Sequence, residues 1–435
     1  MKKLLREYIL RRLWHGVAKR IRMEKPYIIA MTGTVGKTSA KEAIALVLNQ
    51  AGRTVLKTSG NMNTETGVAL SLLGFSVSPK GLHWLSAIFA SWFPPTWPAD
   101  PRPCYIVEFS ADKPGDISFL AGKLPFQAGV LTVITPVHMQ FYANLDQLIA
   151  EKTSLFQGLQ PDGYAVLNAD DPNQTAVSLS LPKVIWYGIR EKPTNRAGVW
   201  ARNLELTDKG LAFQLDFIAA RKMDSIAKEQ PHSLTIQSTL IGRHQVYSLL
   251  AAAAVGFGER VAFAKIKKAL EEYVVPNGRG KIIAGQKDTL IVDDSYNASP
   301  AAVVAGLRML RPLAKKRRVV AILGRMNELG DLAETAHKEV ARAAAGSVDY
   351  LVAVGQYEKL MLKEAKAAGL APDKMLGFAT TEQLADKLEQ FVRRGDLLYF
   401  KGSQNGVQLE RAVKRIMARP QDAQHLLVRQ YNQNA

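Results

Sequence analysis

The chain has 435 residues, of which 47% are apolar and 22% are charged, which is long and apolar enough for about two or three domains with filled cores. This composition excludes an intrinsically disordered chain. The one cysteine, Cys104, cannot form an internal disulfide, and no group of cysteines and histidines has zinc-ligand spacing, so we expect a reducing, cytoplasmic setting. The formal net charge of +18 favours anionic partners but does not choose among nucleotides, nucleic acid, anionic lipid and phosphorylated substrates.

The first 25 residues form a basic amphipathic segment, which we predict to be a helix. Lysine and arginine side chains surround one apolar stripe, made of Leu5, Ile9, Leu13, Val17 and Ile21. The stripe either packs on the following domain or lies on an anionic membrane surface. The apolar segment 84–93 (WLSAIFASWF) leaves a similar choice between an interfacial element and a buried helix cap, and it is far shorter than the about 20 residues that cross a bilayer. We therefore expect a cytoplasmic protein, with contact at the inner face of the membrane as the open alternative.

A glycine-rich loop follows the first predicted strand. The apolar run YIIAM at 27–31 leads into TGTVGKTS at 32–39, and residues 39–51 have the pattern of a helix that ends at Gly52. The general phosphate-loop pattern GxxxxGK would need a glycine at Met31, so the match is to a shorter variant, GTxGKT.

Each residue type in this loop suits the binding of a nucleotide phosphate. The loop and the start of the helix offer backbone N–H groups to the phosphates. Lys37 supplies a cation for the β and γ oxygens, and Thr38 supplies a hydroxyl for Mg²⁺. We therefore predict an ATP-binding site with Mg²⁺, formed by Gly33, Thr34, Gly36, Lys37, Thr38 and Ser39.

The rest of the chain indicates two α/β domains. In the first domain we predict strands at 105–107, 128–134 and 164–167, and the alternation at 203–217 predicts an antiparallel patch with a turn at 207–210. A regular strand-helix rhythm follows, with strands at 289–292, 319–323, 350–354 and 397–400. It is typical of a Rossmann-like, doubly wound domain. The predicted organisation is a basic helix at 1–25, a central ATP-binding domain at 26–275 and a C-terminal domain at 276–435.

Three further residues could serve a phosphate site, although none is a strong signal by itself. Glu108 ends an apolar run, where a carboxylate could hold magnesium, but strand-end glutamates are more often solvated or capping residues. His138 follows another apolar run, where a histidine more often satisfies a local structural role. Lys152 lies in a predicted helix and would ordinarily be read as solvated surface.

Taken together, these segments resemble the Mur ligase family, ATP-dependent enzymes that add amino acids to the peptidoglycan precursor. The likeness is greatest to the MurF branch, which joins D-alanyl-D-alanine to a UDP-N-acetylmuramoyl tripeptide. Nine segments in family order carry it, from about residue 27 to 415: TGTVGKTSAKE, SGNMNTETGVALSLLG, VEFSADKPGDI, ITPVHM, GYAVLNADDP, GRHQVYSLLAAAAV, DDSYNASP, LGRMNELGD and KGSQ.

The resemblance implies roles for individual residues around the phosphates. Lys37 and Thr38 would bind ATP phosphates and Mg²⁺, and Glu108 would share that metal. His138 would hold a second magnesium ion. Lys152 matches the lysine that becomes carbamylated in the family and supports the second metal, so the catalytic set would be Lys37, His138 and Lys152.

Other matched positions imply contacts with the nucleotide and the substrate. Positions that match nucleotide contacts are Arg279, Asp294, with its carboxylate near the ribose, and Asn297 in the neighbouring motif. Positions that match substrate contacts are Asn61 and Asn63, in a loop that faces the muramoyl moiety, and Lys401 and Ser403, in a motif that lines the cleft.

The implied reaction is ATP-dependent amide formation through an acyl phosphate. We expect the protein to be a monomeric acid–amino-acid ligase that does not bind nucleic acid. Its substrates would be a muramoyl-peptide precursor and D-alanyl-D-alanine. Because only the basic helix precedes the phosphate loop, we expect the usual UDP-binding domain to be absent, which leaves a lipid-linked or otherwise different acceptor as an alternative. A non-catalytic regulatory protein on a ligase scaffold is the other alternative, since four family positions differ: Ser154, Gln245, Ser248 and Gln404.

Overall fold

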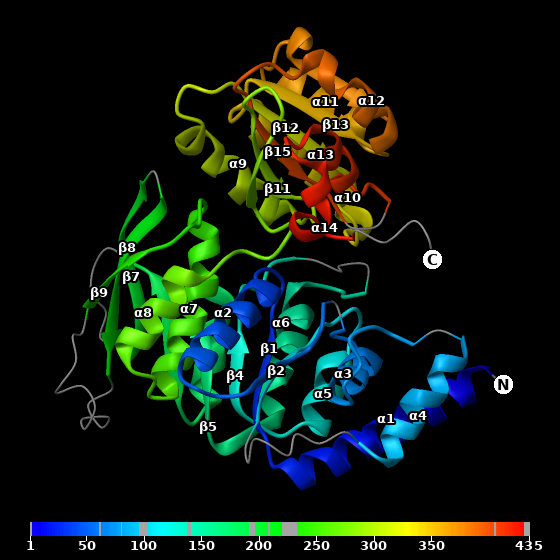
Figure 1. The fold of residues 1–435 in the computed structure, drawn as a ribbon, viewed down its shortest axis with the longest axis vertical. Helices are drawn as coiled ribbons and strands as arrows, with labels where there is room; N and C mark the ends of the chain where they lie inside the picture. The colour runs from blue at the N-terminus through cyan, green and yellow to red at the C-terminus, as the bar shows by residue number, and fades with distance from the viewer. Residues whose placement is uncertain are drawn as a thin grey trace. The chain divides into compact units, whose positions relative to one another are not determined.

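The computed structural model describes residues 2–60, 62–79, 81–94, 103–136, 141–190, 196–207, 209–219, 233–403 and 406–429. This part of the chain divides into two compact units. Unit 1 holds the described residues up to 239 together with 245–273, and unit 2 holds 240–244 and 274–429. Each unit is built on its own sheet (Figure 1).

The described part of unit 1 contains a nine-stranded sheet in the order β2-β3-β1-β4-β5-β6-β7-β8-β9. The strands from β2 to β7 pair in parallel, and β8 and β9 continue the sheet antiparallel. The strands are β1 (Tyr27–Thr32), β2 (Val55–Lys57), β3 (Cys104–Glu108), β4 (Phe126–Leu131), β5 (Leu159–Asn168), β6 (Val184–Ile189), β7 (Gly198–Thr207), β8 (Gly210–Ile218) and β9 (Ser233–Gln237).

Helices cover the parallel part of this sheet. One apolar core joins alternate residues of β1 and β3, such as Ile28 and Tyr105, to the helices α1, α3 and α5. Alternate side chains of a strand point to opposite faces, so Ile29 and Met31 are buried on the other face. The helices are α1 (Lys2–Glu24), α2 (Lys37–Gln50), α3 (Glu65–Leu72), α4 (Trp84–Trp92), α5 (Asp116–Lys123), α6 (Leu145–Thr153), α7 (Arg243–Gly258) and α8 (Phe263–Glu272).

Unit 2 has a six-stranded sheet in its described residues, in the order β10-β11-β15-β12-β13-β14. Only β10 at one edge runs antiparallel, among the strand pairs of this described sheet. The strands are β10 (Lys281–Ala284), β11 (Leu290–Asp294), β12 (Val319–Gly324), β13 (Tyr350–Val354), β14 (Met375–Phe378) and β15 (Leu397–Lys401). The helices are α9 (Pro300–Ala314), α10 (Ala333–Ala345), α11 (Glu358–Ala367), α12 (Thr381–Phe391), α13 (Glu410–Ile416) and α14 (Ala423–Leu426).

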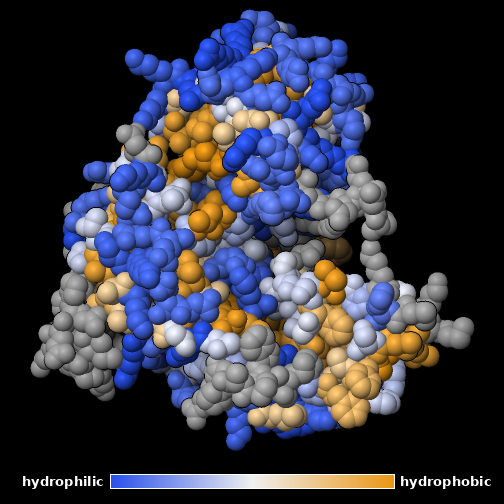
Figure 2. Space-filling view, in the orientation of Figure 1, coloured by the Kyte–Doolittle hydropathy of each residue, from blue (hydrophilic) through white to orange (hydrophobic). Residues whose placement is uncertain are grey.

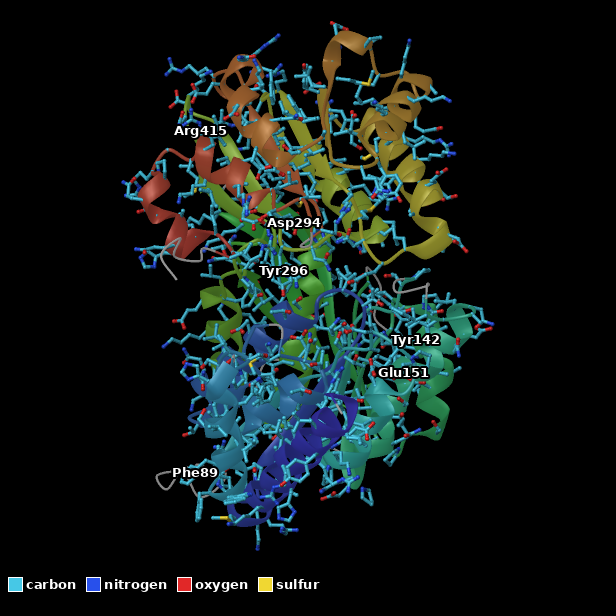
Figure 3. All side chains as sticks on the ribbon, turned by 90° about the vertical axis from the view of Figure 1, so that its right-hand side faces the viewer. Phe89, Tyr142, Glu151, Asp294, Tyr296 and Arg415 are labelled. Carbon is cyan, nitrogen blue, oxygen red and sulfur yellow. The ribbon has the colours of Figure 1, made fainter. Side chains whose placement is uncertain are left out.

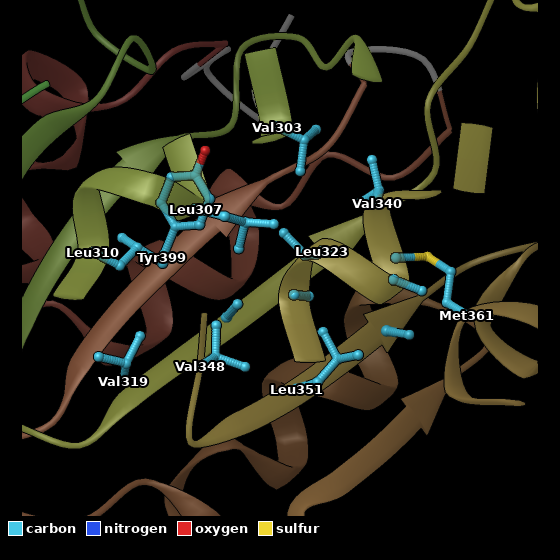
Figure 4. Close-up of a cluster of buried hydrophobic side chains, with 14 of the residues drawn as sticks. Val303, Leu307, Leu310, Val319, Leu323, Val340, Val348, Leu351, Met361 and Tyr399 are labelled. Carbon is cyan, nitrogen blue, oxygen red and sulfur yellow. The ribbon is translucent and has the colours of Figure 1, made fainter. Parts of the chain in front are cut away.

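The two faces of the unit 2 sheet carry separate apolar cores. Figure 4 shows Leu307 and Leu310 of α9 packed with Leu323 of β12 and Tyr399 of β15. The neighbouring residues of these strands, such as Phe400, point to the other face and pack with α12 and α13. This is a three-layer doubly wound domain, and the α/β fold class predicted from the sequence is confirmed for both units.

The predicted elements match these strands and helices with a few differences. The strand predicted at 128–134 is wrong at both ends, because β4 spans Phe126–Leu131 and Val133 forms only an isolated bridge with Val35. The helix predicted at 39–51 begins two residues earlier, at Lys37. Short 3₁₀ turns link several elements, among them η1 (Gly81–His83), η2 (Ser154–Gly158) and η5 (Gly330–Leu332). No helix in the described ranges is long and apolar enough to cross a membrane.

Candidate active site

The phosphate loop leaves the carboxyl end of β1 and enters α2. Gly33 and Gly36 have φ values of +143° and +89°, a region that residues with a Cβ rarely adopt. A Cβ on Gly33 would also lie 1.9 Å from the hydroxyl oxygen of Thr132. The loop therefore requires glycine at the two positions that define the GTxGKT pattern.

Lys37 folds back over this loop. Its Nζ donates hydrogen bonds to the carbonyl oxygens of Gly33 at 2.7 Å and Thr34 at 3.4 Å. Lys37 is also the first residue of α2, and the first turn of α2 contains no acidic residue. The positive end of the helix dipole and a lysine ammonium thus meet at one loop, an arrangement that favours an anion.

Glu108 lies beside the phosphate loop at the end of β3. Because β1 and β3 are parallel neighbours, Met31 pairs with Glu108 and both strands end at the same sheet edge. The buried carboxylate accepts hydrogen bonds from the hydroxyl of Thr38, at 3.3 and 3.5 Å, and from the side-chain amide of Asn63, at 3.1 Å. A third partner is Lys41, whose Nζ lies 3.1 Å from the carboxylate in a buried ion pair.

These neighbours decide the charge of Glu108. Burial by itself would raise the pKa of this carboxyl, but Lys41, Lys37 and the amide of Asn63 together hold the pKa below its usual value. Glu108 is therefore a carboxylate at neutral pH.

The oxygens of Thr38 and Glu108 fit a magnesium ion. Two oxygens in adjacent octahedral positions at about 2.1 Å from Mg²⁺ are about 3 Å apart. The hydroxyl of Thr38 is 3.3 Å from the nearer carboxylate oxygen of Glu108. A carboxylate offers about four lone-pair sites, so the contacts with Lys41 and Asn63 leave acceptor capacity on Glu108. Hydroxyl and carboxylate oxygens are also the donors that this hard cation prefers.

Lys152 is a buried amine on α6. Burial lowers its pKa to about 7, and the nearby charge of Lys37 acts in the same direction, while Glu151, Asp112 and Asp116 oppose the change. The neutral form of Lys152 is therefore accessible near neutral pH, unlike that of an exposed lysine. A neutral amine is the form that reacts with electrophiles such as carbon dioxide.

The adjacent residue, Glu151, fixes the position of α6 against α5. Its two carboxylate oxygens accept backbone hydrogen bonds from Gly115 at 2.8 Å and Ile117 at 2.7 Å, at the start of α5. Tyr142 is buried near this carboxylate, and burial together with Glu151 raises the pKa of its phenol. Figure 3 shows Tyr142 and Glu151 together in unit 1.

Unit 2 has a second polar cluster, at the carboxyl ends of β11 and β15. Asp294 pairs in register with Lys401, and the Nζ of Lys401 lies 2.6 Å from a carboxylate oxygen of Asp294. The hydroxyl of Tyr399 donates to the same oxygen at 3.1 Å. Lys401 also donates to the backbone carbonyl of Asn297 at 3.2 Å, so one lysine joins two motifs that are far apart in the sequence.

Two further residues of this cluster make well-defined contacts. The hydroxyl of Ser403 donates to the carbonyl of Ala298 at 3.2 Å and accepts from the backbone N–H of Asn327 at 2.9 Å. The guanidinium of Arg279 lies 4.1 Å from the ring centre of Tyr296, in a cation–π contact. Figure 3 labels Asp294 and Tyr296 in this part of unit 2.

Comparison with protein families assigns both halves of this chain. Residues 101–256 match the Mur ligase middle domain, and residues 278–404 match the domain described as "Mur ligase, glutamate ligase domain". This chain belongs to the Mur ligase family. The family resemblance read from the sequence motifs is thereby confirmed.

Individual relatives of this Mur ligase are distant in sequence. The UDP-N-acetylmuramoyl-tripeptide–D-alanyl-D-alanine ligase of Escherichia coli (strain K12) is 28% identical over 333 residues, which are 76% of this chain and 64% of that enzyme. The match therefore spans slightly less than two thirds of the curated relative. The crystal structure of MurF from Acinetobacter baumannii shares the fold, with a TM-score of 0.75 at 23% identity over 93% of this chain and 79% of that chain.

A second solved structure gives the same result for the fold. MurF ligase from Thermotoga maritima, in complex with ADP, has a TM-score of 0.73 at 21% identity. The similarity covers 96% of this chain and 84% of that chain. Both similarities extend over the two units described above.

The structure brings together most of the site residues expected in this Mur ligase, in two groups. In unit 1, Thr38 and Asn63 contact Glu108, while Lys37 lies within electrostatic range of both Glu108 and Lys152. In unit 2, Asp294, Asn297 and Lys401 form one group, with Ser403 on the adjoining loop. The predicted residues Asn61 and His138, and the divergent Gln404, lie outside the described residues.

The other divergent positions lie in the described part of unit 1. The hydroxyl of Ser154 donates to the carbonyl of Glu151 at 2.7 Å. Gln245 and Ser248 are buried on α7. A Cβ on Gly36 would lie 3.7 Å from the hydroxyl oxygen of Ser248, so this serine borders the phosphate loop.

Sequence reasoning missed two charged residues of the site, Lys41 and Glu151. Lys41 follows Lys37 by four residues, a spacing that places both on one side of α2, and this spacing is the signal that could have found it. Glu151 directly precedes Lys152, but its contacts with the start of α5 depend on tertiary packing. No local sequence pattern predicts this role of Glu151.

Proposed function

We propose that this Mur ligase is an ATP-dependent amide ligase that activates a carboxylate as an acyl phosphate. The observation that carries the proposal is the cluster in unit 1. There, a phosphate loop with Lys37 adjoins the paired oxygens of Thr38 and Glu108, and the buried amine of Lys152 lies within electrostatic range of Lys37. A site for phosphate transfer needs these cationic and oxygen-donor groups together.

The residues of the cluster have separate tasks in the proposed reaction. The N–H groups of the loop and the ammonium of Lys37 bind and orient the phosphates and offset the charge that builds up on the transferred phosphoryl group. Lys41 holds the Glu108 carboxylate ionised and in place. The substrate carboxylate would attack the γ-phosphorus of ATP and displace ADP, which gives the acyl phosphate. The incoming amine would then attack the carbonyl carbon, lose a proton and displace phosphate, which forms the amide bond.

Magnesium would be held by Thr38 and Glu108, and it would supply positive charge to the phosphate oxygens. The resemblance adds His138 and a carbamylated Lys152 as ligands of a second magnesium ion. The low pKa of Lys152 supports this role, because carbamylation requires the neutral amine. Arg279, Asp294 and Asn297 are proposed as nucleotide contacts, and Asn61, Asn63, Lys401 and Ser403 as substrate contacts.

We assign the substrates by similarity to MurF enzymes. The proposed acceptor is a UDP-N-acetylmuramoyl tripeptide, and the proposed amine is D-alanyl-D-alanine. Support comes from the 28% identity to the E. coli ligase that bears these substrates in its name. The reaction would be a step of peptidoglycan precursor synthesis.

The proposal can be tested with purified full-length protein. We would incubate it with ATP, Mg²⁺, the UDP-muramoyl tripeptide and D-alanyl-D-alanine, and measure phosphate release and the mass of the product. We expect ligated pentapeptide and phosphate in equal amounts, and a loss of at least about 100-fold in Lys37→Met, since Lys37 acts on the developing charge. Lys316→Met, at an exposed lysine of unit 2, is the matched control. Substrate binding without any ATP turnover would instead support a regulatory protein.

A lipid-linked muramoyl acceptor is the second candidate substrate. The observation that favours it is the exposed apolar surface of α1 and α4, because such a surface would hold the enzyme near a membrane-bound substrate. The same assay with a lipid-linked muramoyl peptide in detergent micelles separates the two substrates. If product forms with the lipid-linked substrate and not with the UDP-linked one, the lipid-linked acceptor is the substrate.

A further inference from the structure

Helix α4 is apolar on two faces, and in the described part of the chain only one of them is covered. Ala87 and Ser91 are buried against α1, where Gly16 lets the two helices approach closely. A Cβ on Gly16 would lie 2.6 Å from the Cα of Ser91. Trp84 also packs on the core of unit 1, whereas Leu85, Phe89 and Trp92 are exposed to solvent.

The uncovered face of α4 forms a continuous aromatic and aliphatic stripe. Leu85, Phe89 and Trp92 repeat at intervals of four and three residues, so they lie on one side of the helix, and Phe93 follows directly. Each of them is more than half exposed. The rings of Phe89 and Phe93 are 5.2 Å apart. Figure 2 shows apolar atoms gathered over α4, and Figure 3 places Phe89 at the outer edge of unit 1.

Helix α1 extends this surface. Its Leu13 and Val17 are buried in the core of unit 1, but its first turns expose Leu4, Leu5 and Tyr8. The amphipathic stripe predicted from the sequence is therefore divided. Its later part packs on the domain, and its earlier part is open to solvent beside α4.

Positive charge surrounds the exposed apolar stripe. Helix α1 contains eight lysine and arginine residues but only two glutamates, and residues 81–94 contain no lysine, arginine, aspartate or glutamate. The guanidinium of Arg12 lies 5.5 Å from the ring centre of Trp92. Lys19 lies 5.7 Å from the ring of Phe93 and donates to the backbone carbonyl of Trp92 at 2.9 Å. The cations are thus held next to the aromatic side chains.

We infer that α1 and α4 together form a peripheral anchor that binds the surface of an anionic phospholipid bilayer. The aromatic and leucine side chains enter the boundary between headgroups and acyl chains, and the lysine and arginine side chains meet the lipid phosphates. Neither helix spans the bilayer: α4 has nine residues, and α1 has charged residues throughout its length. This role is independent of the ligase reaction.

Charge complementarity favours lipid over another protein as the occupant of this surface. The centres of protein–protein interfaces are depleted of lysine, whereas interfacial helices combine a ring of lysine and arginine with tryptophan and phenylalanine. In the described part of α1 and α4, Arg6, Arg11 and Arg22 are exposed and Glu7 is the one fully exposed acidic side chain. The surface of an anionic bilayer is uniformly negative and extends in two dimensions, so it matches this distribution of charge.

The test is flotation of the full-length protein with lipid vesicles. We expect binding to vesicles with about one third phosphatidylglycerol, and at least tenfold weaker binding to pure phosphatidylcholine vesicles. Raising the salt concentration from 0.05 to 0.5 M should also weaken binding at least tenfold, because salt screens the interactions between exposed charges and the membrane.

Two sets of variants separate the apolar and the charged contributions. The triple variant Leu85→Ser/Phe89→Ser/Phe93→Ser should bind vesicles at least tenfold more weakly than the parent. The double variant Arg6→Glu/Arg11→Glu should bind more weakly to anionic vesicles only. The matched controls, at exposed residues of unit 2, are Val274→Ser/Ile282→Ser/Leu332→Ser and Lys316→Glu/Lys366→Glu, and they should bind like the parent.

Three results would overturn the inference. The first is no flotation with anionic vesicles. The second is equal binding by the apolar variant, provided that its thermal midpoint shows a folded protein. The third is a parent protein that forms dimers by light scattering, does not float, and becomes monomeric in the apolar variant; this result would identify the surface as an interface between copies of the chain.

Discussion

Replacement of Lys152 by methionine tests the energetic cost of burying this amine. The pKa of Lys152 falls from 10.5 to about 7, a drop of about 3.5, mainly because burial disfavours the charged form. At about 1.4 kcal/mol for each pKa unit, the charged amine lowers the free energy of unfolding by about 5 kcal/mol at low pH. Methionine has a similar length and carries no such penalty.

The sign of the pH dependence follows from proton binding. Between pH 7 and 10.5 the unfolded chain holds more protons on Lys152 than the folded protein does, so the free energy of unfolding rises with pH in this window. Below pH 7 both states are protonated and the full cost applies. Lys152→Met should therefore have a higher free energy of unfolding than the parent, and this difference should be about 2 kcal/mol larger at pH 7 than at pH 9.

The assay is urea unfolding followed by tryptophan fluorescence, in buffer free of carbon dioxide so that the amine itself is measured. All six tryptophans lie within the first 200 residues, so the signal reports unit 1. Lys265→Met, at an exposed lysine of α8, controls for the loss of one positive charge. If the stabilisation by Lys152→Met differs by less than about 0.5 kcal/mol between pH 7 and pH 9, or is larger at pH 9, burying this amine is not costly.

Three further substitutions test contacts described above. Lys41→Met should lower the free energy of unfolding by about 3–5 kcal/mol, because it leaves the Glu108 carboxylate buried without its cation, and a loss below about 1 kcal/mol in urea unfolding would contradict this pairing. Gly306→Ala should cost about 2 kcal/mol by calorimetry, since its Cβ would lie 1.9 Å from the Tyr399 hydroxyl oxygen, and a more stable variant would argue against close contact. Glu151→Gln should accelerate hydrogen exchange of the amides at the start of α5, and unchanged exchange would exclude a capping role.

Strands with buried, β-branched sequences were predictable from the sequence. The strand at 350–354 has the predicted bounds, and the turn predicted at 207–210 closes the hairpin of β7 and β8. The short strands β2 and β14 were not predicted, because each is an edge strand of three or four residues without a clear apolar pattern. Val133 misled the prediction for β4, because apolar character alone does not show that the chain has left the ladder to bridge Val35.

The site was predictable where one motif contains its chemistry. Spacing and residue type alone predicted the glycine loop and its lysine, and the structure places this loop between β1 and the start of α2. The environment of Glu108 was not, because Lys41 and Asn63 reach it from different segments of the chain. For each of the two apolar segments, at 5–21 and 84–93, the sequence left open whether it packs on the domain or lies on a membrane surface. The structure shows one packed part and one exposed part in each helix, which the sequence pattern did not separate.

The contact between α1 and α4 also bears on the order of events during synthesis. Leu13 and Val17 are covered in the finished protein by segments that include α3 and α4, which the ribosome makes roughly 50–80 residues later. At about 5–20 residues per second, the whole stripe of α1 is uncovered for several seconds. The nascent chain therefore exposes the whole amphipathic sequence, whereas the folded protein exposes only its first turns. A ribosome translating near the bilayer would give lipid access to a longer apolar stripe than the folded protein exposes.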